Sequence, residues 1–549
     1  MLFSRRFMPY FFTQSLGALN DNVFKNVLLL MVSYSQVNTL PMAVDLFVNL
    51  AAGLFILPFL LFSAHAGQLA DNVDKALLIR RLKMFELCIM LVAMWAILTH
   101  SYLVMLLLLF LMGVQSAYFG PVKYSLLPRI LHEHELVSGN AWVEVGTFLA
   151  ILMGTLSAGI IVASDMSTYW AAAMVFVLAL LGVIASRLIP DVPCLTPVTS
   201  PFSIIKATRT TIARGRKNWD IWMAILAISW FWFLGATYLT QIPNFSRVTL
   251  NADPTVVSLL LLLFSMGIGI GSFACERLSH QQVELGIAAL GLLVLGLFGI
   301  DLYSALPSAP VTAPMWDVVH FIADTRHYRL MFDLFMIGVG GGLFIVPLYT
   351  FIQVRAKEEE CAQAIACNNI FNALFMVASA IIAMLLLVGL QWPIERLFLV
   401  LAYSSLLVLL TLLLTWSELL TATFSYGVCR IFNRCVIVNT AELDKIKEDK
   451  KTSIIIEVER LNLLTLLVVN SLFSRPVYVA TQPPSATGLT KYLIACRQRS
   501  DVTAPAAVLM CCQGDEIPTA VEPVTTLKCR VTRQSKGYLL GRVETVISR

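Results

Sequence analysis

The sequence predicts an all-α membrane protein in which twelve spanning helices form two sets of six, followed by a small C-terminal α/β domain. Hydrophobic residues make up 58% of the 549 residues and charged residues only 13%, whereas soluble proteins average about 25% charged residues. A hydrocarbon core about 30 Å thick takes roughly 20 helical residues to cross, and apolar segments of that length recur up to residue 418. The net charge of +5 is too small to indicate a nucleic-acid partner.

The apolar segments fall into two groups on either side of a basic, proline-rich linker. The segments are 9–37, 42–65, 76–99, 101–127, 141–164, 168–189, 218–246, 254–275, 283–303, 329–353, 363–389 and 394–418. The predicted domains are a first bundle at 1–190, a linker at 191–217, a second bundle at 218–420 and a tail at 421–549. No pattern in the sequence indicates a cofactor or a metal site.

The distribution of basic residues predicts which loops face the cytoplasm. The linker carries Lys206, Arg209, Arg214, Arg216 and Lys217. Lys75, Arg80, Arg81 and Lys83 lie at the start of the third segment. The loops on the opposite side hold few cations, so by the positive-inside rule we expect both termini to be cytoplasmic.

Six helices, a basic linker and six more helices is the plan of a major facilitator transporter. In that fold the substrate site lies near the midplane between two halves, and one half rocks on the other to give alternating access. Polar residues inside the predicted helices are therefore the candidates for the substrate path.

The first segment carries the strongest polar signal of the chain. Asp21 is predicted to lie well inside the bilayer, with Asn22 and Lys25 close by. An acid there costs at least about 2.5–3.5 kcal/mol, so it normally faces a bundle interior or a water-filled cavity. We interpret Asp21 as a substrate-path or gating residue; the alternative is a structural ion pair with Lys25, one turn further on.

Residues 67–75 resemble the signature that major facilitator transporters carry between their second and third helices. We expect Gly67 to permit a tight turn. Asp71 is placed to cap a helix start and to pair with a cation of a neighbouring helix. Lys75 supplies the terminal basic residue, while Asp74 stands where the pattern has glycine. We expect this motif to act in conformational gating.

The fourth and fifth segments supply two further charged residues near the inner face. Lys123 precedes Tyr124 in the fourth segment, and Glu144 lies near the start of the fifth. Lys123 either snorkels to the interface or acts as a cation for a phosphate head group or a partner for Asp21. Glu144 is either a path residue or an interfacial carboxylate.

In the second half, amides and hydroxyls replace charges. Tyr238 and Gln241 could line a path or hydrogen-bond between helices. Asn368 and Asn372 share a helix face, and Asn369 lies between them. We expect this polar stripe to oppose Asp21, with helix–helix hydrogen bonding as the alternative. A glycine-rich run at 338–342 predicts a bent or closely packed helix.

Four stretches together resemble the lysophospholipid transporters of Gram-negative bacteria, most closely those fused to a 2-acylglycerophosphoethanolamine acyltransferase. They are GALNDNVFKN at 17–26, the motif at 67–75, FGPVKYSLLP at 119–128 and the run from Gly341 to Phe375.

The resemblance implies flipping of lysophosphatidylethanolamine and lysophosphatidylglycerol from the outer to the inner leaflet of the inner membrane, where a separate acyltransferase or acyl carrier protein system acts on them. It also implies that Asp21 and Lys123 match the family's first-helix acid and fourth-helix lysine. Arg355 matches the basic residue after the tenth helix, but Val354 replaces a glutamate that is frequent there.

The tail contains short β-type runs at 477–481, 492–495, 507–510, 526–531 and 538–546. Residues 454–480 are similar to the region around the acyltransferase His-x4-Asp motif, but the best register puts Arg460 and Thr465 at its two catalytic positions. No histidine follows His327 in this sequence. We therefore predict a transporter and not an enzyme. Two alternatives stay open: a facilitator for another amphiphile or small solute, and a transporter–acyltransferase fusion.

Overall fold

The computed structural model describes most of the helical region and parts of the tail. The described residues are 1–33, 44–162, 164, 166–193, 204–279, 283–306, 315–426, 435–438, 453–458, 477–479, 508–512, 524–533 and 539–548. They divide into two compact units. The first comprises Met1–Gln281 with Leu290–Leu407, and the second comprises Gln282–Ala289 with Val408–Arg549.

Within the described residues, one helix of 20 residues or more stands for each of the twelve predicted segments. They are α1 (Met8–Ser33), α2 (Val44–Asn72), α3 (Lys75–Leu98), α4 (Tyr102–Ile130), α5 (Leu136–Val162), α6 (Ser167–Arg187), α8 (Trp219–Val248), α9 (Pro254–Leu278), α10 (Leu285–Ser304), α12 (Tyr328–Arg355), α13 (Cys361–Met384) and α14 (Ile394–Thr415). Shorter helical elements are η2 (Glu133–Glu135), α7 (Ile204–Lys217), α11 (Val318–Ala323), η3 (Thr325–His327), η4 (Leu385–Gly389) and α15 (Ser417–Tyr426).

Ten described helices are long and apolar enough to cross a membrane. The two long helices outside that set are α1 and α3. α1 carries Asp21, Lys25 and several amides, and α3 carries Lys83 and Glu86 beside its basic start. Charged and amide side chains lower the mean hydropathy of both helices, and charges inside a membrane bundle normally face its interior or a water-filled cavity.

Several helix starts are fixed by local side-chain capping. Asn218 Oδ1 accepts from the backbone N–H of Asp220 at 3.1 Å where α8 begins. Asp253 Oδ1 accepts from the N–H of Thr255 at 2.8 Å, and Pro254 occupies the first position of α9. Both arrangements satisfy N–H groups that have no partner within the helix.

The glycine run of α12 lets that helix pack closely against α9, as the sequence predicted. A Cβ placed on Gly342 would lie 2.3 Å from the carbonyl oxygen of Ile268. A Cβ on Gly271 of α9 would lie 2.1 Å from the carbonyl oxygen of Val339. No larger residue fits at either position without moving the backbones apart, which is the role of small residues between membrane helices.

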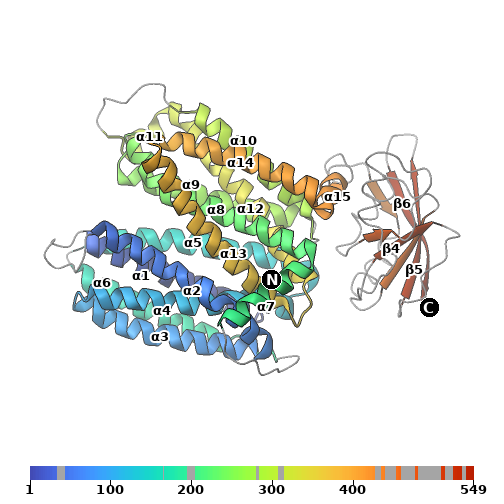
Figure 1. Ribbon diagram of the computed structural model, residues 1–549, viewed down its shortest axis with the longest axis horizontal. Coiled ribbons are helices and arrows are strands. Elements are labelled where there is room, and N and C mark those ends of the chain that lie inside the picture. The colour runs from blue at the N-terminus through green and yellow to red at the C-terminus, as the bar shows by residue number, and fades with distance from the viewer. Residues whose placement is uncertain are drawn as a thin grey trace. The chain divides into compact units, whose positions relative to one another are not determined.

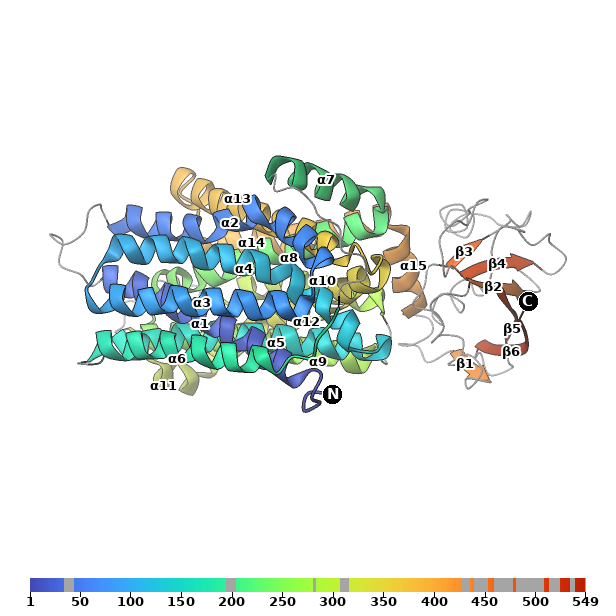
Figure 2. The same ribbon diagram turned by 90° about the horizontal axis from the view of Figure 1, so that it is seen from below.

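Helices α1 to α6 pack together as one bundle, and α8, α9 and α12 belong to a second (Figure 1). α13 lies against α2 of the first bundle and against α8 of the second. We call the end where α2 ends and α13 begins the linker end, because α7 of the linker lies there, and we call the other end the α11 end (Figure 2). Within the predicted linker at 191–217, α7 is a helix of 14 residues.

The described parts of the tail form one six-stranded sheet in the order β1-β6-β5-β2-β4-β3. The strands are β1 (Cys435–Val438), β2 (Ser453–Val458), β3 (Val477–Val479), β4 (Val508–Cys512), β5 (Val524–Arg533) and β6 (Leu539–Ser548). β5 and β6 pair antiparallel, and the other neighbours pair parallel. Four predicted β-type runs coincide with strands, whereas the run at 492–495, Arg460 and Thr465 lie outside the described residues.

Candidate functional site

A buried cluster of charges and amides joins α1, α3 and α4 inside the first bundle. Lys83 Nζ donates to Glu86 Oε2 at 2.7 Å, and both side chains are only 1% exposed. Glu86 also accepts from Asn20 Nδ2 at 3.2 Å and from Gln115 Nε2 at 3.1 Å. These hydrogen bonds compensate the carboxylate for the water it loses on burial. We call these four residues the Glu86 cluster.

The neighbours of Lys83 explain how a long cation fits inside the bundle. A Cβ on Gly17 would lie 2.4 Å from Lys83 Nζ, so the glycine leaves room for the ammonium in its present position beside α1. The ammonium also lies 5.3 Å from the centre of the Phe119 ring, within the range of a cation–π interaction. Lys83, which the sequence groups with the cations at the start of α3, is therefore buried inside the bundle.

Asp21 adjoins the Glu86 cluster through α4. Ser116 Oγ donates to Asp21 Oδ2 at 2.7 Å and lies 3.3 Å from Gln115 Oε1. Asp21 Oδ1 is buried and has no hydrogen-bond partner. Lys25 Nζ donates to Asn22 Oδ1 at 3.2 Å, and the described ion pairs do not include Asp21 with Lys25. Asp21 and Lys25 therefore make no direct ion pair in this conformation, and the role of Asp21 in the substrate path stays a prediction.

A second group lies nearer the linker end, where α4 meets α5. Lys123 is buried, and its Nζ donates to Thr147 Oγ1 at 3.1 Å. Tyr124 OH donates to Glu144 Oε1 at 2.8 Å, while Glu144 Oε2 has no partner. The Lys123 side chain is therefore turned into the protein, and the Glu144 carboxylate is buried at 1% exposure. Their roles as path residues stay predictions. Asp21 is not the partner of Lys123 here.

Tyr124 links this group to the second bundle. Its ring stacks on that of Tyr349 from α12, with 4.2 Å between ring centres and 4° between planes. Tyr349 OH accepts from Trp232 Nε1 at 3.3 Å and from Asn368 Nδ2 at 3.4 Å. The two bundles thus share a stacked tyrosine pair whose hydroxyls are held from opposite sides.

An amide pair also joins the two bundles, between α5 and α12; we call this contact region of the two bundles the seam. Asn140 Nδ2 donates to Gln353 Oε1 at 2.6 Å, and Gln353 Nε2 donates to Asn140 Oδ1 at 3.1 Å. Gln353 Nε2 also lies 3.1 Å from the carbonyl oxygen of Tyr124. Neither Asn140 nor Gln353 stood out in the sequence, because single amides in apolar helices carry no spacing pattern.

The predicted asparagine stripe of α13 is buried. Asn368 bonds to Tyr349 as described, and Asn372 lies 3.0 Å from Ser229 Oγ of α8. A Cβ on Gly120 of α4 would lie 2.4 Å from Asn369 Nδ2, so Asn369 packs directly on the first bundle. In this conformation Asn368 and Asn372 make contacts of the helix–helix kind; path lining by the stripe stays a prediction.

Tyr238 and Gln241 lie apart from this seam. The Tyr238 ring packs 4.9 Å from that of Phe398 and 5.8 Å from that of Phe264, inside the second bundle. Its hydroxyl is buried and has no partner, and Gln241 is half-buried. Their role as path residues stays a prediction.

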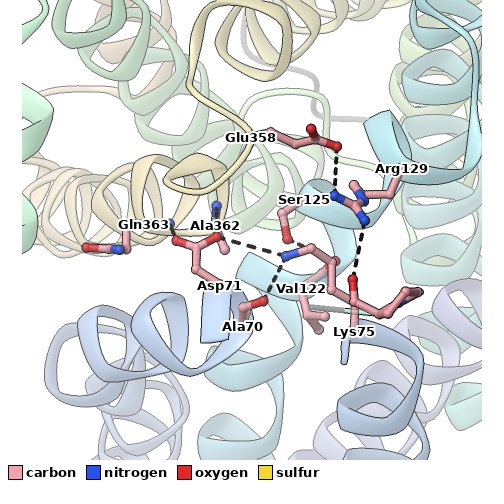
Figure 3. Close-up of polar contacts among 10 residues, drawn as sticks. Ala70, Asp71, Lys75, Val122, Ser125, Arg129, Glu358, Ala362 and Gln363 are labelled. Atoms are coloured by element: carbon pink, nitrogen blue, oxygen red, sulfur yellow. Dashed lines mark hydrogen bonds and ion pairs between the residues drawn. The ribbon is translucent and has the colours of Figure 1, made fainter. Parts of the chain in front are cut away.

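The 67–75 motif closes the linker end against α13 (Figure 3). Asp71 Oδ1 accepts from the N–H of Ala362 at 3.0 Å, and Oδ2 accepts from that of Gln363 at 3.1 Å. A carboxylate of the first bundle therefore caps the start of a helix of the second, where the helix dipole favours negative charge. Lys75 Nζ lies 3.9 Å from Asp71 Oδ1 and donates to the carbonyl of Ala70 at 2.7 Å.

Gly67 does not form the turn that the sequence suggested. It lies within α2, which runs seven residues further than predicted. A Cβ there would lie 2.5 Å from Ala366 Cβ and 2.9 Å from the carbonyl oxygen of Ala362. The glycine is needed for close approach of α2 to α13, and not for backbone freedom.

A salt bridge also crosses the linker end. Arg129 Nη1 of α4 lies 2.8 Å from Glu358 Oε1, just before α13 (Figure 3). Arg355 lies over the Phe351 ring at 5.1 Å. Val354 cannot form an ion pair, but the Arg129–Glu358 ion pair joins the two bundles at the same end. Among the described residues, no group of three or more His, Cys, Asp or Glu side chains is arranged to hold a metal ion.

Comparison with known families gives the geometry its context. The model of the Major Facilitator Superfamily matches residues 7–324, more than half of the sequence. The chain belongs to the major facilitator superfamily. It is therefore a multi-pass membrane transporter, and the contacts between its bundles are contacts between the two halves of that fold.

Curated relatives of this facilitator share a name. It is 27% identical over 390 residues to "Lysophospholipid transporter LplT" of Enterobacter sp. (strain 638), covering 67% of this chain and 85% of the relative. It is 25% identical over 403 residues to the protein of the same name from Escherichia coli O157:H7, covering 71% and 90%. No fused acyltransferase is evident from these matches.

Solved structures support the fold alone. The human organic anion transporter MFSD10 (TETRAN) has a TM-score of 0.59 at 12% identity, covering 74% of this chain and 98% of that one. The E. coli fucose:proton symporter FucP has a TM-score of 0.55 at 11% identity, with 74% and 98% covered. At such identities neither structure identifies a substrate.

Proposed function

We propose that this transporter moves lysophospholipids such as lysophosphatidylethanolamine from the outer to the inner leaflet of a bacterial inner membrane by alternating access. A separate acyltransferase or acyl carrier protein system would then re-acylate them. The observation that carries the proposal is the match to relatives named lysophospholipid transporter over as much as 90% of their length.

The buried charges of the first half fit such a cargo. A lysolipid has one acyl chain and a charged head group, so its path needs apolar walls and a few polar groups. Asp21 Oδ1 and Glu144 Oε2 are buried acceptors without donors, and Lys123 is a buried cation. In a low-dielectric interior, acceptors without donors favour a cationic group and a buried cation favours a phosphate. The two together fit a zwitterionic head group.

The proposed direction rests on orientation and on where the halves meet. The basic linker and α3 start favour a cytoplasmic linker end and cytoplasmic termini. The cap at Asp71, the Arg129–Glu358 ion pair and the Tyr124–Tyr349 stack all hold the halves together toward that end. We interpret this conformation as the one that accepts cargo from the outer leaflet.

A flipping assay in proteoliposomes tests the proposal. Fluorescent lysophosphatidylethanolamine is placed in one leaflet, and its arrival in the other is followed without an ion gradient. We expect movement faster than in protein-free vesicles, with competition by unlabelled lysophosphatidylethanolamine and lysophosphatidylglycerol. Movement equal to that of empty vesicles, both without a gradient and with a proton or sodium gradient, would contradict the proposal.

Two alternatives have distinct readouts. Transport of another amphiphile or small solute that lysolipids do not compete with would favour a different facilitator. Transfer of labelled acyl groups by the purified chain would favour a transporter–acyltransferase fusion. The second is disfavoured because no histidine follows His327 in this sequence, and a His-dependent acyltransferase needs that general base.

A further inference from the structure

The linker helix α7 has two faces of different chemistry. Its described side chains include five cations, Lys206, Arg209, Arg214, Arg216 and Lys217, and no acid. All five are exposed. The face turned to the protein consists of small residues, Ala207, Thr211 and Gly215, which are buried at intervals of four. Such spacing places them on one side of the helix and leaves the cations on the others.

Small residues let α7 lie flat in the seam between the two halves. Ala207 packs with Ala64 of α2 and Ile370 of α13. A Cβ on Gly215 would lie 2.9 Å from Cys367 Sγ of α13. Arg214 hydrogen-bonds to Gln363, the residue whose N–H donates to Asp71. α7 therefore contacts both α2 and α13, beside the cap that Asp71 forms on the start of α13.

These contacts also set the depth of α7 along the bundle. Ala64 precedes the end of α2 by eight residues, and Ile370 follows the start of α13 by nine, so Ala207 lies about 12–14 Å inside the linker end at 1.5 Å per residue. Arg214 lies at that end, beside Gln363. α7 thus runs along the outside of the bundle from a deeper level to the linker end (Figure 2).

The two ends of α7 therefore lie at different depths along the bundle, and they differ in chemistry. Ile205, two residues before Ala207, is 83% exposed at the deeper end of α7. Trp219, two residues after α7, is 55% exposed, and tryptophan favours the head-group level. The cations between them have long stems that reach the same level.

We propose that the outer face of α7 is a docking surface for anionic phospholipids of the leaflet at the linker end, with head-group phosphates on its cations and acyl chains beside Ile205. The positive charge of α7 is complementary to such a head group. Each Lys or Arg near an anionic membrane surface raises the binding constant roughly fivefold. The nearest described acid in sequence is Asp220, so α7 itself offers no competing charge.

Hydrogen exchange of the full chain in nanodiscs tests the proposal. We compare peptides covering 204–217 in phosphatidylcholine discs and in discs that also contain phosphatidylglycerol. We expect at least a severalfold slowing of exchange across α7 in the anionic discs, reversed in a high-salt buffer because salt screens the attraction. Equal exchange in the two kinds of disc would overturn the proposal.

Matched variants separate the surface from net charge. Lys206→Gln, Arg209→Gln and Lys217→Gln together remove cations for which no contact with the bundle is described, and should abolish the slowing. Arg81→Gln, Arg187→Gln and Lys357→Gln remove three other exposed cations and should preserve it, as should Arg209→Lys alone. Slowing that persists without the three α7 cations would sink the proposal.

A further arm distinguishes a lipid from a soluble anion. Inorganic phosphate is added to the phosphatidylcholine discs, and no slowing is expected, because free phosphate lacks the membrane surface that concentrates head groups at α7. Slowing by phosphate alone would overturn the lipid assignment in favour of a soluble-anion site. Exchange over α4 serves as the internal check that each variant is folded.

Discussion

The two halves of this transporter meet their common seam with different chemistry. The first half carries full charges in its interior: Lys83, Glu86, Lys123 and Glu144 are buried, and Asp21 is half-buried. The second half answers with neutral groups: Ser229, Tyr349, Gln353, Asn368 and Asn372. Asp333, the buried carboxylate of α12, precedes Tyr349 by 16 residues, about 24 Å along the helix, and so lies well away from this contact.

Burial makes the difference informative. A charge inside a membrane protein costs several kilocalories per mole unless it is compensated, whereas a tyrosine or an amide can exchange partners at little cost. We infer that the charged half recognises the cargo head group, and that the neutral half forms an adaptable wall that can move against it. The predictions below test that division, from the largest expected effect to the smallest.

Breaking the Glu86 cluster should have the largest effect. Lys83→Met leaves Glu86 as an uncompensated buried charge, with only Asn20 and Gln115 donating to it. Removing one partner of a buried pair costs about 3–5 kcal/mol. We expect little folded protein, measured as the thermal midpoint in detergent by size-exclusion chromatography.

The double variant shows whether the cost comes from the stranded charge. Replacing both Lys83 and Glu86 by methionine removes the charges together, and we expect it to recover most of the lost thermal stability. If the double variant is no more stable than Lys83→Met, then packing and not charge explains the loss. The Glu86 cluster would then stabilise the bundle through the packing of its side chains and not through its compensated charges.

Asp21 should matter for transport more than for folding. Asp21→Asn keeps the size of the side chain and a hydrogen-bonding group for Ser116, but removes the charge. Hydrogen bonds to charged groups contribute about 1.5–3 kcal/mol, so flipping of lysophosphatidylethanolamine should fall roughly 10- to 150-fold. Initial rates in proteoliposomes, corrected for reconstituted protein, give the measurement.

A neutral residue of the other half provides the comparison. Asn372→Ala removes a group that lies 3.0 Å from Ser229 Oγ, and neutral hydrogen bonds contribute only about 0.5–1.5 kcal/mol. We expect a transport loss of roughly 2- to 13-fold, smaller than the loss caused by Asp21→Asn. Equal losses in the two variants would break the proposed division between a charged and a neutral half.

The sequence predicted the fold well because length and hydropathy determine a spanning helix almost alone. Asp21 stood out for the same reason, as a charge in an apolar run. Lys83 and Glu86 did not, because the basic start of α3 made Lys83 look interfacial. Gly67 was misassigned because a glycine serves equally for a turn and for close helix contact, and only the neighbouring α13 decides between them.

The cap at Asp71 should control access to the linker end. Capping and helix-dipole interactions contribute about 0.5–2 kcal/mol, so Asp71→Asn should shift the population toward separated halves by roughly 2- to 30-fold. Cys361 is 2% exposed at the start of α13. Maleimide labelling of Cys361, followed by peptide mass spectrometry and normalised to the amount of intact protein, should rise accordingly.

A matched variant on the same motif guards against general loosening. Asp74 caps α3 by accepting from the N–H of Leu77 at 2.7 Å, wholly within the first half. Asp74→Asn should therefore leave labelling of Cys361 unchanged. If both variants raise it equally, the contact between Asp71 and α13 is not what keeps the linker end closed.

The tyrosine stack should give the smallest effect, and it tests whether the neutral wall is indeed adaptable. Tyr349→Leu removes the ring that stacks on Tyr124 and the acceptor for Trp232 and Asn368. Aromatic pairs contribute about 0.5–1.5 kcal/mol beyond their buried area, so Cys361 labelling should rise by no more than about tenfold. Transport should stay within the same range, since no charge is lost. A loss as large as that of Asp21→Asn would mean that the second half also recognises the cargo directly.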